Sequence, residues 1–212
     1  MPDGPMPESA SPPRLLQEFI DRAAAEPSKL GDAYGALVEA TGGDPFDGPS
    51  VENWRLISAS VGSDFVDRVQ TALREIAPLG VQLVPEPMLR TTLPDHEFLL
   101  VRYRGLDGSR LAKPLFDEQP LEPGAVPSAI EQVERLAAAG WWHRFMDRGY
   151  GHWRVARPAG RLVVTGWRTE LRRHHPSALQ QRMSRTRRLL RELEQRMGVT
   201  DAPSGGQAEE PE

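Results

Sequence analysis

Apolar residues recur at intervals of three or four positions along the first 78 residues of the chain. Such spacing places them on one side of a helix. Four helices are therefore expected, each capped or ended by proline, glycine or a small polar residue, so that residues 13–78 are helical apart from short connectors. The predicted helices are 13–25, 30–41, 50–61 and 65–76.

Beyond residue 78 the pattern favours strands. Residues 97–104 begin with apolar side chains on both faces, which predicts a central strand. A short apolar run at 81–84 is expected to precede it. A turn at 106–108 is expected to return the chain as a partner strand over 109–115.

A helix and a second hairpin are predicted between residues 128 and 165. Ser128 and Glu131 match a capping box, and helical spacing of apolar residues continues to Phe145, with a kink expected at Gly140. The hairpin strands that follow are 152–157 and 161–165.

The last helix is predicted over residues 177–197, with Gly198 as its end. Its apolar side chains form a three-heptad stripe that docks on the parent domain, pairs with a second copy or lies against a partner. The stripe consists of Leu179, Met183, Thr186, Leu190, Leu193 and Met197.

Helices and strands do not alternate regularly, so we expect an α+β fold with a helical N-terminal part and a small, mainly antiparallel sheet of about five strands. A long arginine-rich C-terminal helix completes it. The expected organisation is a disordered tail over 1–12, an α+β domain over 13–175 (helical over 13–78, mixed over 79–175), an amphipathic helix over 176–198 and a disordered acidic tail over 199–212.

The chain has no cysteine, which excludes disulfides, thiolate nucleophiles and cysteine-based metal sites. The first 13 residues lack the basic start and apolar run of a signal peptide. No segment has the roughly 18 apolar residues needed to span a bilayer. A soluble protein in the cytoplasm is therefore expected, without contact to a membrane.

Charge is distributed unevenly. Residues 1–139 hold 12 basic and 22 acidic side chains, a net of −10, whereas residues 140–198 hold 14 basic and 4 acidic, a net of +10. Residues 199–212 add four acidic side chains. This asymmetry indicates either an interaction surface in the C-terminal third or pairing of the two oppositely charged parts within the molecule or across a dimer.

The sequence contains no phosphate-binding loop, dinucleotide fingerprint, nucleophile elbow or zinc-protease helix. An enzyme is therefore the less favoured class, and no cofactor is expected. Asp95, His96 and Glu97 could supply a base, but neighbours in an extended chain point to opposite faces, so a polar turn is the simpler interpretation.

Histidines near the C-terminal third offer a second catalytic alternative. His143 and Asp147 are four apart on the predicted helix and share a face, and His152 could fold back towards them. Two imidazoles and a carboxylate suit zinc or non-haem iron, but their spacing matches no known metal motif, so no metal is predicted. His174 and His175 are expected in an exposed connector.

Arginines and aromatic rings are interleaved from residue 141 to 168, a mixture found in nucleic-acid binders. One hypothesis is therefore nucleic-acid binding by the hairpin and last helix, with Trp153 or Trp167 stacking on bases. Against it, the overall pI is near 5.8, and tryptophans at these spacings are more often buried.

The favoured hypothesis is a non-enzymatic adaptor or assembly subunit that binds a protein partner, or a second copy of itself, through the arginine-rich third. Nucleic-acid binding is the first alternative, and an enzyme with a non-linear His/Asp site is the second. The predicted partner-binding residues are Arg154, Arg157, Arg161, Arg168, Arg172, Arg173, Arg182, Arg185 and Arg188.

Overall fold

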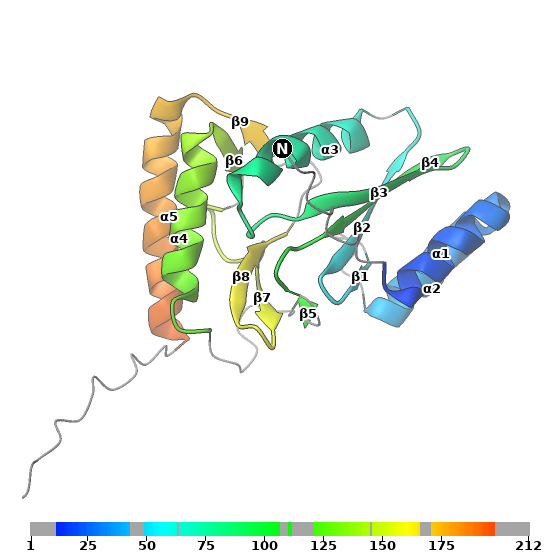
Figure 1. The fold of residues 1–212 in the computed structure, drawn as a ribbon, viewed down its shortest axis with the longest axis horizontal. Helices are drawn as coiled ribbons and strands as arrows, with labels where there is room; N and C mark the ends of the chain where they lie inside the picture. Colours follow the sequence, from blue (N-terminus) through cyan, green and yellow to red (C-terminus); the bar gives the residue numbers. More distant parts are fainter. Residues whose placement is uncertain are drawn as a thin grey trace, which may run out of the picture.

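The structure is a computed structural model that describes residues 12–42, 49–62, 64–106, 110–111, 121–144, 146–165 and 171–197. Helices and antiparallel strands are mixed without regular alternation, which confirms the predicted α+β class (Figure 1). The predicted tails, 1–12 and 199–212, lie outside the described residues apart from Pro12. None of the described helices is long and apolar enough to cross a membrane.

The helices occupy three positions around the strands (Figure 1). The first two form a hairpin at one end of the molecule, the third lies across the sheet, and the last two run side by side at the other end. Their bounds are α1 (Arg14–Ala25), α2 (Leu30–Thr41), α3 (Phe65–Ile76), α4 (Ala125–Ala138) and α5 (Pro176–Arg196), with short 3₁₀ turns η1 (Pro27–Lys29) and η2 (Ala77–Leu79).

Four strands form the main sheet in the order β1-β2-β4-β3, and every pair is antiparallel. A three-stranded sheet in the order β5-β7-β8 and a β6-β9 ribbon accompany it. The strands are β1 (Ser50–Val51), β2 (Trp54–Ser60), β3 (Glu86–Thr92), β4 (His96–Arg102), β5 (Arg110–Leu111), β6 (Trp141–His143), β7 (Trp153–Arg157), β8 (Arg161–Val164) and β9 (Leu171–Arg173).

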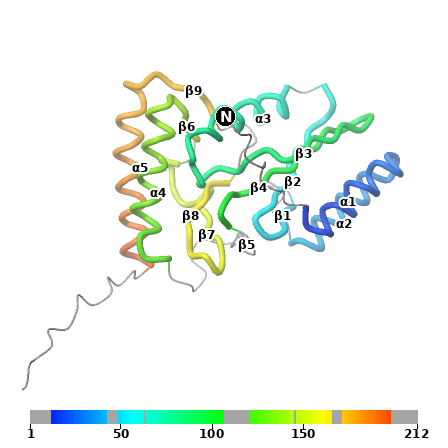
Figure 2. Tube along the Cα trace, viewed as in Figure 1, coloured from blue at the N-terminus to red at the C-terminus, as the bar shows by residue number. Residues whose placement is uncertain are grey.

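The main sheet is buried on both faces. Leu56 and Leu100 are opposite one another and pack on the α1–α2 hairpin in a smaller core. Their sequence neighbours Ile57 and Leu99 face the other way, into a larger core built with α3, α4, α5 and the remaining strands. The path of the chain through these layers is traced in Figure 2.

The prediction of a helix over 50–61 is wrong, because this segment forms β1 and β2. Trp54, Leu56 and Ile57 are all buried, on opposite faces of the sheet. A strand covered on both faces loses the apolar–polar alternation that identifies a half-buried strand. The three- to four-residue spacing of Trp54, Ile57 and Val61 then imitates a helix.

The predicted hairpin of 97–104 with 109–115 is also wrong. β4 pairs with β2 and β3, whereas β5 pairs with β7. The apolar run 81–84 is not a strand, and β3 begins two residues later and includes Pro87. Proline is compatible with β3 because this strand forms an edge of the sheet, beside an irregularity in the pairing.

The predicted helix through Phe145 ends at Ala138. Gly140 has a φ of +80°, which a helix does not accommodate, and Trp141 then begins β6. The start also differs, since α4 begins at Ala125. Ser128 therefore lies inside the helix, where its hydroxyl accepts a hydrogen bond from Gln132 instead of capping the N-terminus.

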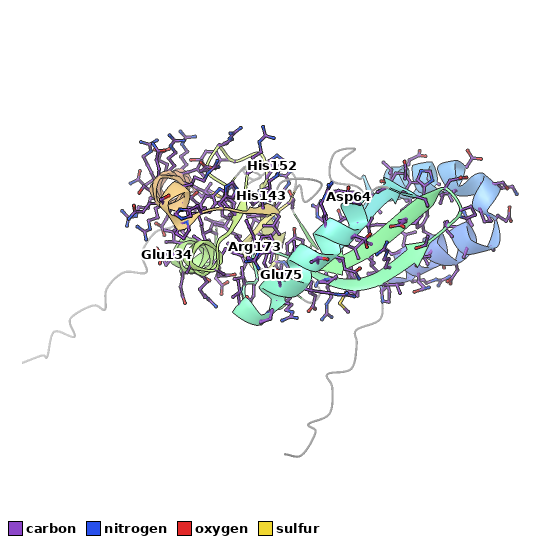
Figure 3. All side chains as sticks on the ribbon, turned by 90° about the horizontal axis from the view of Figure 1, so that it is seen from above. Asp64, Glu75, Glu134, His143, His152 and Arg173 are labelled. Carbon is purple, nitrogen blue, oxygen red and sulfur yellow. The ribbon has the colours of Figure 1, made fainter. Side chains whose placement is uncertain are left out.

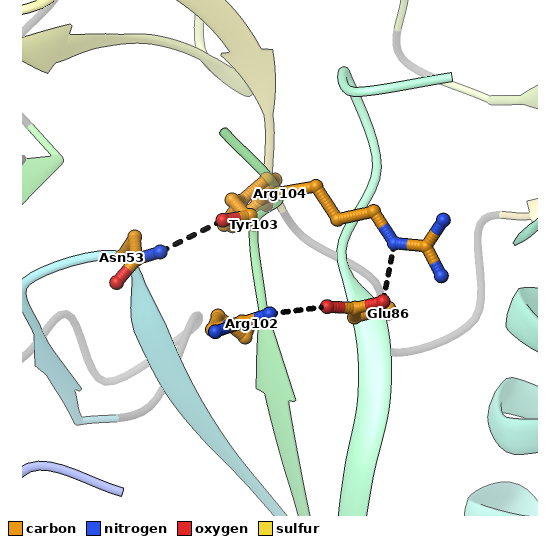
Figure 4. Close-up of polar contacts among 5 residues, drawn as sticks. All are labelled: Asn53, Glu86, Arg102, Tyr103 and Arg104. Carbon is orange, nitrogen blue, oxygen red and sulfur yellow. Dashed lines mark hydrogen bonds and ion pairs between the residues drawn. The ribbon is translucent and has the colours of Figure 1, made fainter. Parts of the chain in front are cut away.

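Tyr103 connects the main sheet to the smaller one. Its backbone N–H donates to the carbonyl of Asn53, and the Asn53 side chain donates to the Tyr103 carbonyl at 2.8 Å. Its hydroxyl donates to the Val164 carbonyl of β8. Beside it, the Glu86 carboxylate accepts hydrogen bonds from Arg102 at 3.0 Å and from Arg104. The hydroxyl contact joins the two sheets, whereas the Asn53 and Glu86 contacts lie within the main sheet and the residues beside it (Figure 4).

The predicted hairpin of 152–157 with 161–165 and the long C-terminal helix are confirmed as β7–β8 and α5. The helices predicted over 13–25, 30–41 and 65–76 are confirmed as α1, α2 and α3. Gly42 ends α2 in the left-handed conformation, as its position after the apolar stripe predicted.

Candidate functional site

The apolar stripe of α5 packs inside the molecule. Leu179, Met183, Leu190 and Leu193 are at most 8% exposed and belong to the larger core. α5 lies beside α4 along its length (Figures 1 and 3). The stripe therefore docks on its own domain, and it neither pairs with a second copy nor lies against a partner. The surface that α5 offers to other molecules is its opposite side.

Two arginines flank the buried stripe, and each forms an ion pair with another part of the fold. On one side Arg182 donates to the Asp147 carboxylate at 3.3 Å. On the other, Arg187 donates to Glu134 of α4 through Nε and Nη2, at 2.9 and 2.5 Å. Both guanidinium groups therefore have carboxylate partners within the fold.

The remaining arginines of the middle of α5 point away from the core. At about 100° per residue, Arg188 lies about 180° around the helix from the centre of the stripe, with Arg185 and Arg191 about 60° to either side. All three are exposed. We call this set the outer arginine face: Arg185, Arg188 and Arg191.

The outer arginine face is poorly neutralised. Arg188 approaches Glu192 of the same helix only to 3.8 Å. Across the described part of the chain, neither Arg185 nor Arg191 has an ion-pair partner. α5 as a whole carries six arginines and two glutamates, a net of +4. Its outer side is therefore a cationic surface on a rigid, well-packed helix.

The strand β9 leads into α5 and carries two more of the predicted residues. Arg172 and Arg173 are both exposed. The guanidinium of Arg173 lies over the Trp141 ring at 4.9 Å and pairs with Glu75 of α3 (Figure 3). Arg173 thus joins β9 to α3, while its side chain stays 65% exposed.

A groove lies between α3 and the β6–β9 ribbon, with a volume of about 570 Å³. More of its surface is apolar than polar, and both walls contribute apolar side chains. The apolar residues are Phe65, Val69, Ala72, Trp141 and Leu171, and the polar ones are Asp64, Asp67, Arg68, Thr71, Arg172 and Arg173.

The hairpin arginines do not form one surface. Arg154 donates to the carbonyls of Gly151 and Trp153, and Arg161 donates towards Glu122 at 3.4 Å. Arg157 is half-buried at the end of β7, and its Nε and Nη2 have no hydrogen-bond partner among the described residues. Arg168 and Trp167 lie outside the described residues.

Trp153 is fully buried, so the prediction that it stacks on bases is wrong. The other tryptophans that the structure describes, Trp54, Trp141 and Trp142, are at most 7% exposed. The described surface therefore offers no tryptophan platform for nucleic-acid bases.

The histidine candidates do not form a metal site. His143 lies in β6 and not on a helix, and its ring centroid is 5.9 Å from that of His152 (Figure 3). The Asp147 carboxylate instead accepts from Arg182 and from the Trp142 indole. In the described ranges no three His, Cys, Asp or Glu side chains are arranged to hold a metal ion.

The other polar candidates have local partners. His96 and Glu97 face opposite sides of β4, as expected, and Glu97 accepts from Arg90 at 2.7 Å. His175 caps α5 by accepting from the Ser177 N–H. His174 is half-buried: burial lowers its pKa, Arg182 and Arg172 lower it further, and Asp147 opposes them.

Two parts of this site were missed from the sequence. Arg191 follows Arg188 by three residues, so the helical repeat could have identified it as part of the same face. The groove gave no such signal, because Phe65, Trp141 and Leu171 are far apart in the chain and meet only through the packing of α3 on the ribbon.

Comparison with known proteins identifies no relative: no protein family matches this chain, and no curated protein or solved structure is significantly similar to it.

Proposed function

We propose that this protein is a non-enzymatic adaptor or assembly subunit that binds an acidic segment of a protein partner on the outer arginine face of α5. The cysteine-free chain is compatible with a reducing compartment, and the cytoplasm remains the predicted location.

The proposal rests on a difference between the arginines of α5: some have carboxylate partners within the fold, and others do not. Arg182 and Arg187 flank the buried stripe and are used within the fold, whereas Arg185 and Arg191 have no ion-pair partner in the described regions. Arg185, Arg188 and Arg191 follow one another at intervals of three, so their charges repel along the helix. Carboxylates of a partner would relieve this repulsion.

A protein partner fits better than a nucleic acid. Glu192 lies on the same side of α5, 3.8 Å from Arg188, where it would repel phosphates. The four described tryptophans are buried, so no described tryptophan is exposed beside the outer arginine face to stack on bases, as single-strand binders require. A short acidic peptide can place its carboxylates around Glu192, whereas a regular phosphate backbone cannot choose its positions as freely.

The test measures binding of a labelled oligoglutamate peptide, and of single- and double-stranded oligonucleotides, at low and moderate salt. The variant is Arg185→Gln/Arg188→Gln/Arg191→Gln. We expect oligoglutamate to bind, to weaken as salt rises, and to lose about tenfold or more in affinity with the variant. The matched control removes the same charge from α1 and α3 through Arg14→Gln, Arg22→Gln and Arg74→Gln, which are exposed positions.

Equal binding by the wild-type protein and the α5 variant would overturn the proposal. Tighter binding of oligonucleotides than of oligoglutamate, lost in the α5 variant, would replace it with nucleic-acid binding. Loss of binding in both the α5 variant and the control would show that only net charge matters, and this would also contradict a specific face.

A further inference from the structure

The groove between α3 and the β6–β9 ribbon has the composition of an anchor pocket. Phe65, Val69 and Ala72 come from the α3 wall, and Trp141 and Leu171 come from the ribbon. Its volume of about 570 Å³ is within the usual range of ligand pockets and leaves room for a bulky apolar side chain. Apolar linings of this kind gain free energy by excluding water.

The charges around the groove are largely neutralised by one another. Arg68 pairs with Asp64 at 2.5 Å, and Arg90 pairs with Asp67 at 2.5 Å. Arg173 pairs with Glu75 and covers part of the Trp141 ring. The groove therefore favours an apolar side chain over a charged one.

The groove adjoins the start of α5. β9 forms one of its walls, and Pro176 begins α5 three residues after Arg173. The groove therefore lies next to the N-terminal end of α5, and one extended partner segment can reach both the groove and the outer arginine face.

We infer that the groove holds a bulky apolar side chain of the same acidic partner segment. The inference rests on the proposed function, and it adds an anchor to a surface that otherwise offers only charge. Surface charge pairs alone are weak and sensitive to salt, whereas a buried apolar anchor supplies affinity that salt does not remove.

The helix geometry sets the spacing in the partner. Arg185 and Arg191 lie nine and fifteen residues beyond Pro176, about 14 and 22 Å along the helix axis. An extended chain covers about 3.3 Å per residue. The acidic residues are therefore expected at least four to seven positions from the apolar anchor, because the partner chain must also cover the distance from the groove to Pro176.

The probe is the labelled oligoglutamate peptide extended by a short Gly/Ser spacer and one Phe, at either end, beside a matched peptide with Ala in place of Phe. We expect the Phe peptide of one orientation to bind about tenfold tighter, because an aromatic side chain is buried. The ratio should persist at moderate salt.

Thr71→Trp tests the location, since Thr71 is an exposed residue of α3 that lines the groove. This variant should abolish the advantage of Phe over Ala. Thr71→Ala keeps the groove open, and Arg74→Trp adds the same ring to an exposed α3 position that does not line it. Both should keep the advantage, and unfolding midpoints check that all variants are folded.

The outcomes separate the two proposals. If oligoglutamate binds through α5 but Phe adds nothing in either orientation, the groove inference is overturned and the proposed function stands. An advantage of Phe that survives Thr71→Trp also overturns it. If the advantage depends on Thr71 while the α5 arginines are dispensable, the anchor is supported and the proposed acidic partner is not.

Discussion

Arg182 of α5 donates to the carboxylate of Asp147 at 3.3 Å, although only 2% of the Asp147 side chain is exposed. The same carboxylate oxygen accepts from the indole of the buried Trp142 at 3.4 Å. One acidic side chain thus fixes the loop after β6 to both the helix and the core. Asp147→Asn removes the counter-charge of a half-buried arginine, and we expect a loss of about 1–3 kcal/mol in unfolding free energy, measured by urea denaturation.

Arg187→Gln is the matched change on the other flank of α5. The Arg187–Glu134 side chains are 46% and 43% exposed, so solvent screens this pair and its loss should cost less than about 1 kcal/mol. Similar losses for both variants would contradict the structural importance of Asp147.

Gln132 is a buried amide that joins α4 to the segment before β3. Its side-chain oxygen accepts from the backbone N–H of Gln82 at 2.6 Å and of Leu83 at 2.9 Å. Gln132→Met keeps the size but leaves both donors without this acceptor, so about 2 kcal/mol or more of unfolding free energy should be lost. Ser128→Ala removes only the minor contact of the amide and should cost less than about 1 kcal/mol; the reverse order would refute the assignment.

Gly160 closes the β7–β8 turn against the segment that leads into α4. Its φ is +66°, and a Cβ there would meet the backbone nitrogen of Glu122 at 2.6 Å. Gly160→Ala should therefore lower the thermal unfolding midpoint by several degrees, corresponding to about 1–3 kcal/mol. Gly151→Ala is the control, because a Cβ at Gly151 meets no atom within 4 Å. An unchanged midpoint for Gly160→Ala would show that the turn adapts.

His174 gives the fold a dependence on pH. Burial and the nearby Arg182 and Arg172 lower its pKa below the ordinary 6.5, so the folded state resists protonation. The contribution of His174 to the unfolding free energy is fully present above pH 6.5, and it is lost as the pH falls from 6.5 towards the pKa of the folded state. The test is urea denaturation of the wild-type protein and of His174→Gln from pH 8 to pH 5. Plotted against pH, the two unfolding free energies should run parallel above 6.5. Below 6.5 the wild-type value should fall more steeply than that of the variant.

The His174 comparison is a difference measurement, since the other four histidines of the chain are the same in both proteins. Parallel curves over the whole range would mean that His174 protonates equally in the folded and unfolded states, which would contradict the lowered pKa.

Local sequence signals predicted those elements whose pattern is complete within a short segment. The β7–β8 hairpin was identified from its turn, and α5 from its stripe, because both patterns are complete within a short segment. β2 was missed because it is buried between the α1–α2 hairpin and the larger core. Its long pairing with β4, about forty residues away, is what the local pattern could not reveal.

The candidate site shows the same limit. Helical spacing separates Arg188 from the buried stripe, and that much could be derived from sequence. Sequence could not show that Arg182 has a buried partner in Asp147. Nor could it show that Arg161 donates to Glu122 and Arg154 to the Gly151 carbonyl. These depend on the packing of distant segments, and so does the groove beside Trp141.

The two cores on opposite faces of the main sheet divide the molecule into units of different cooperativity. The α1–α2 hairpin rests on the smaller core alone, through residues such as Leu16 and Phe19, whereas α5 and the groove belong to the larger one. The hairpin can therefore open as a sub-global unit while the larger core stays folded. A ligand held by α5 would slow amide hydrogen exchange in the larger core and leave exchange in α1 and α2 unchanged. The protein would then hold its partner on the part of the fold that stays closed when the hairpin opens.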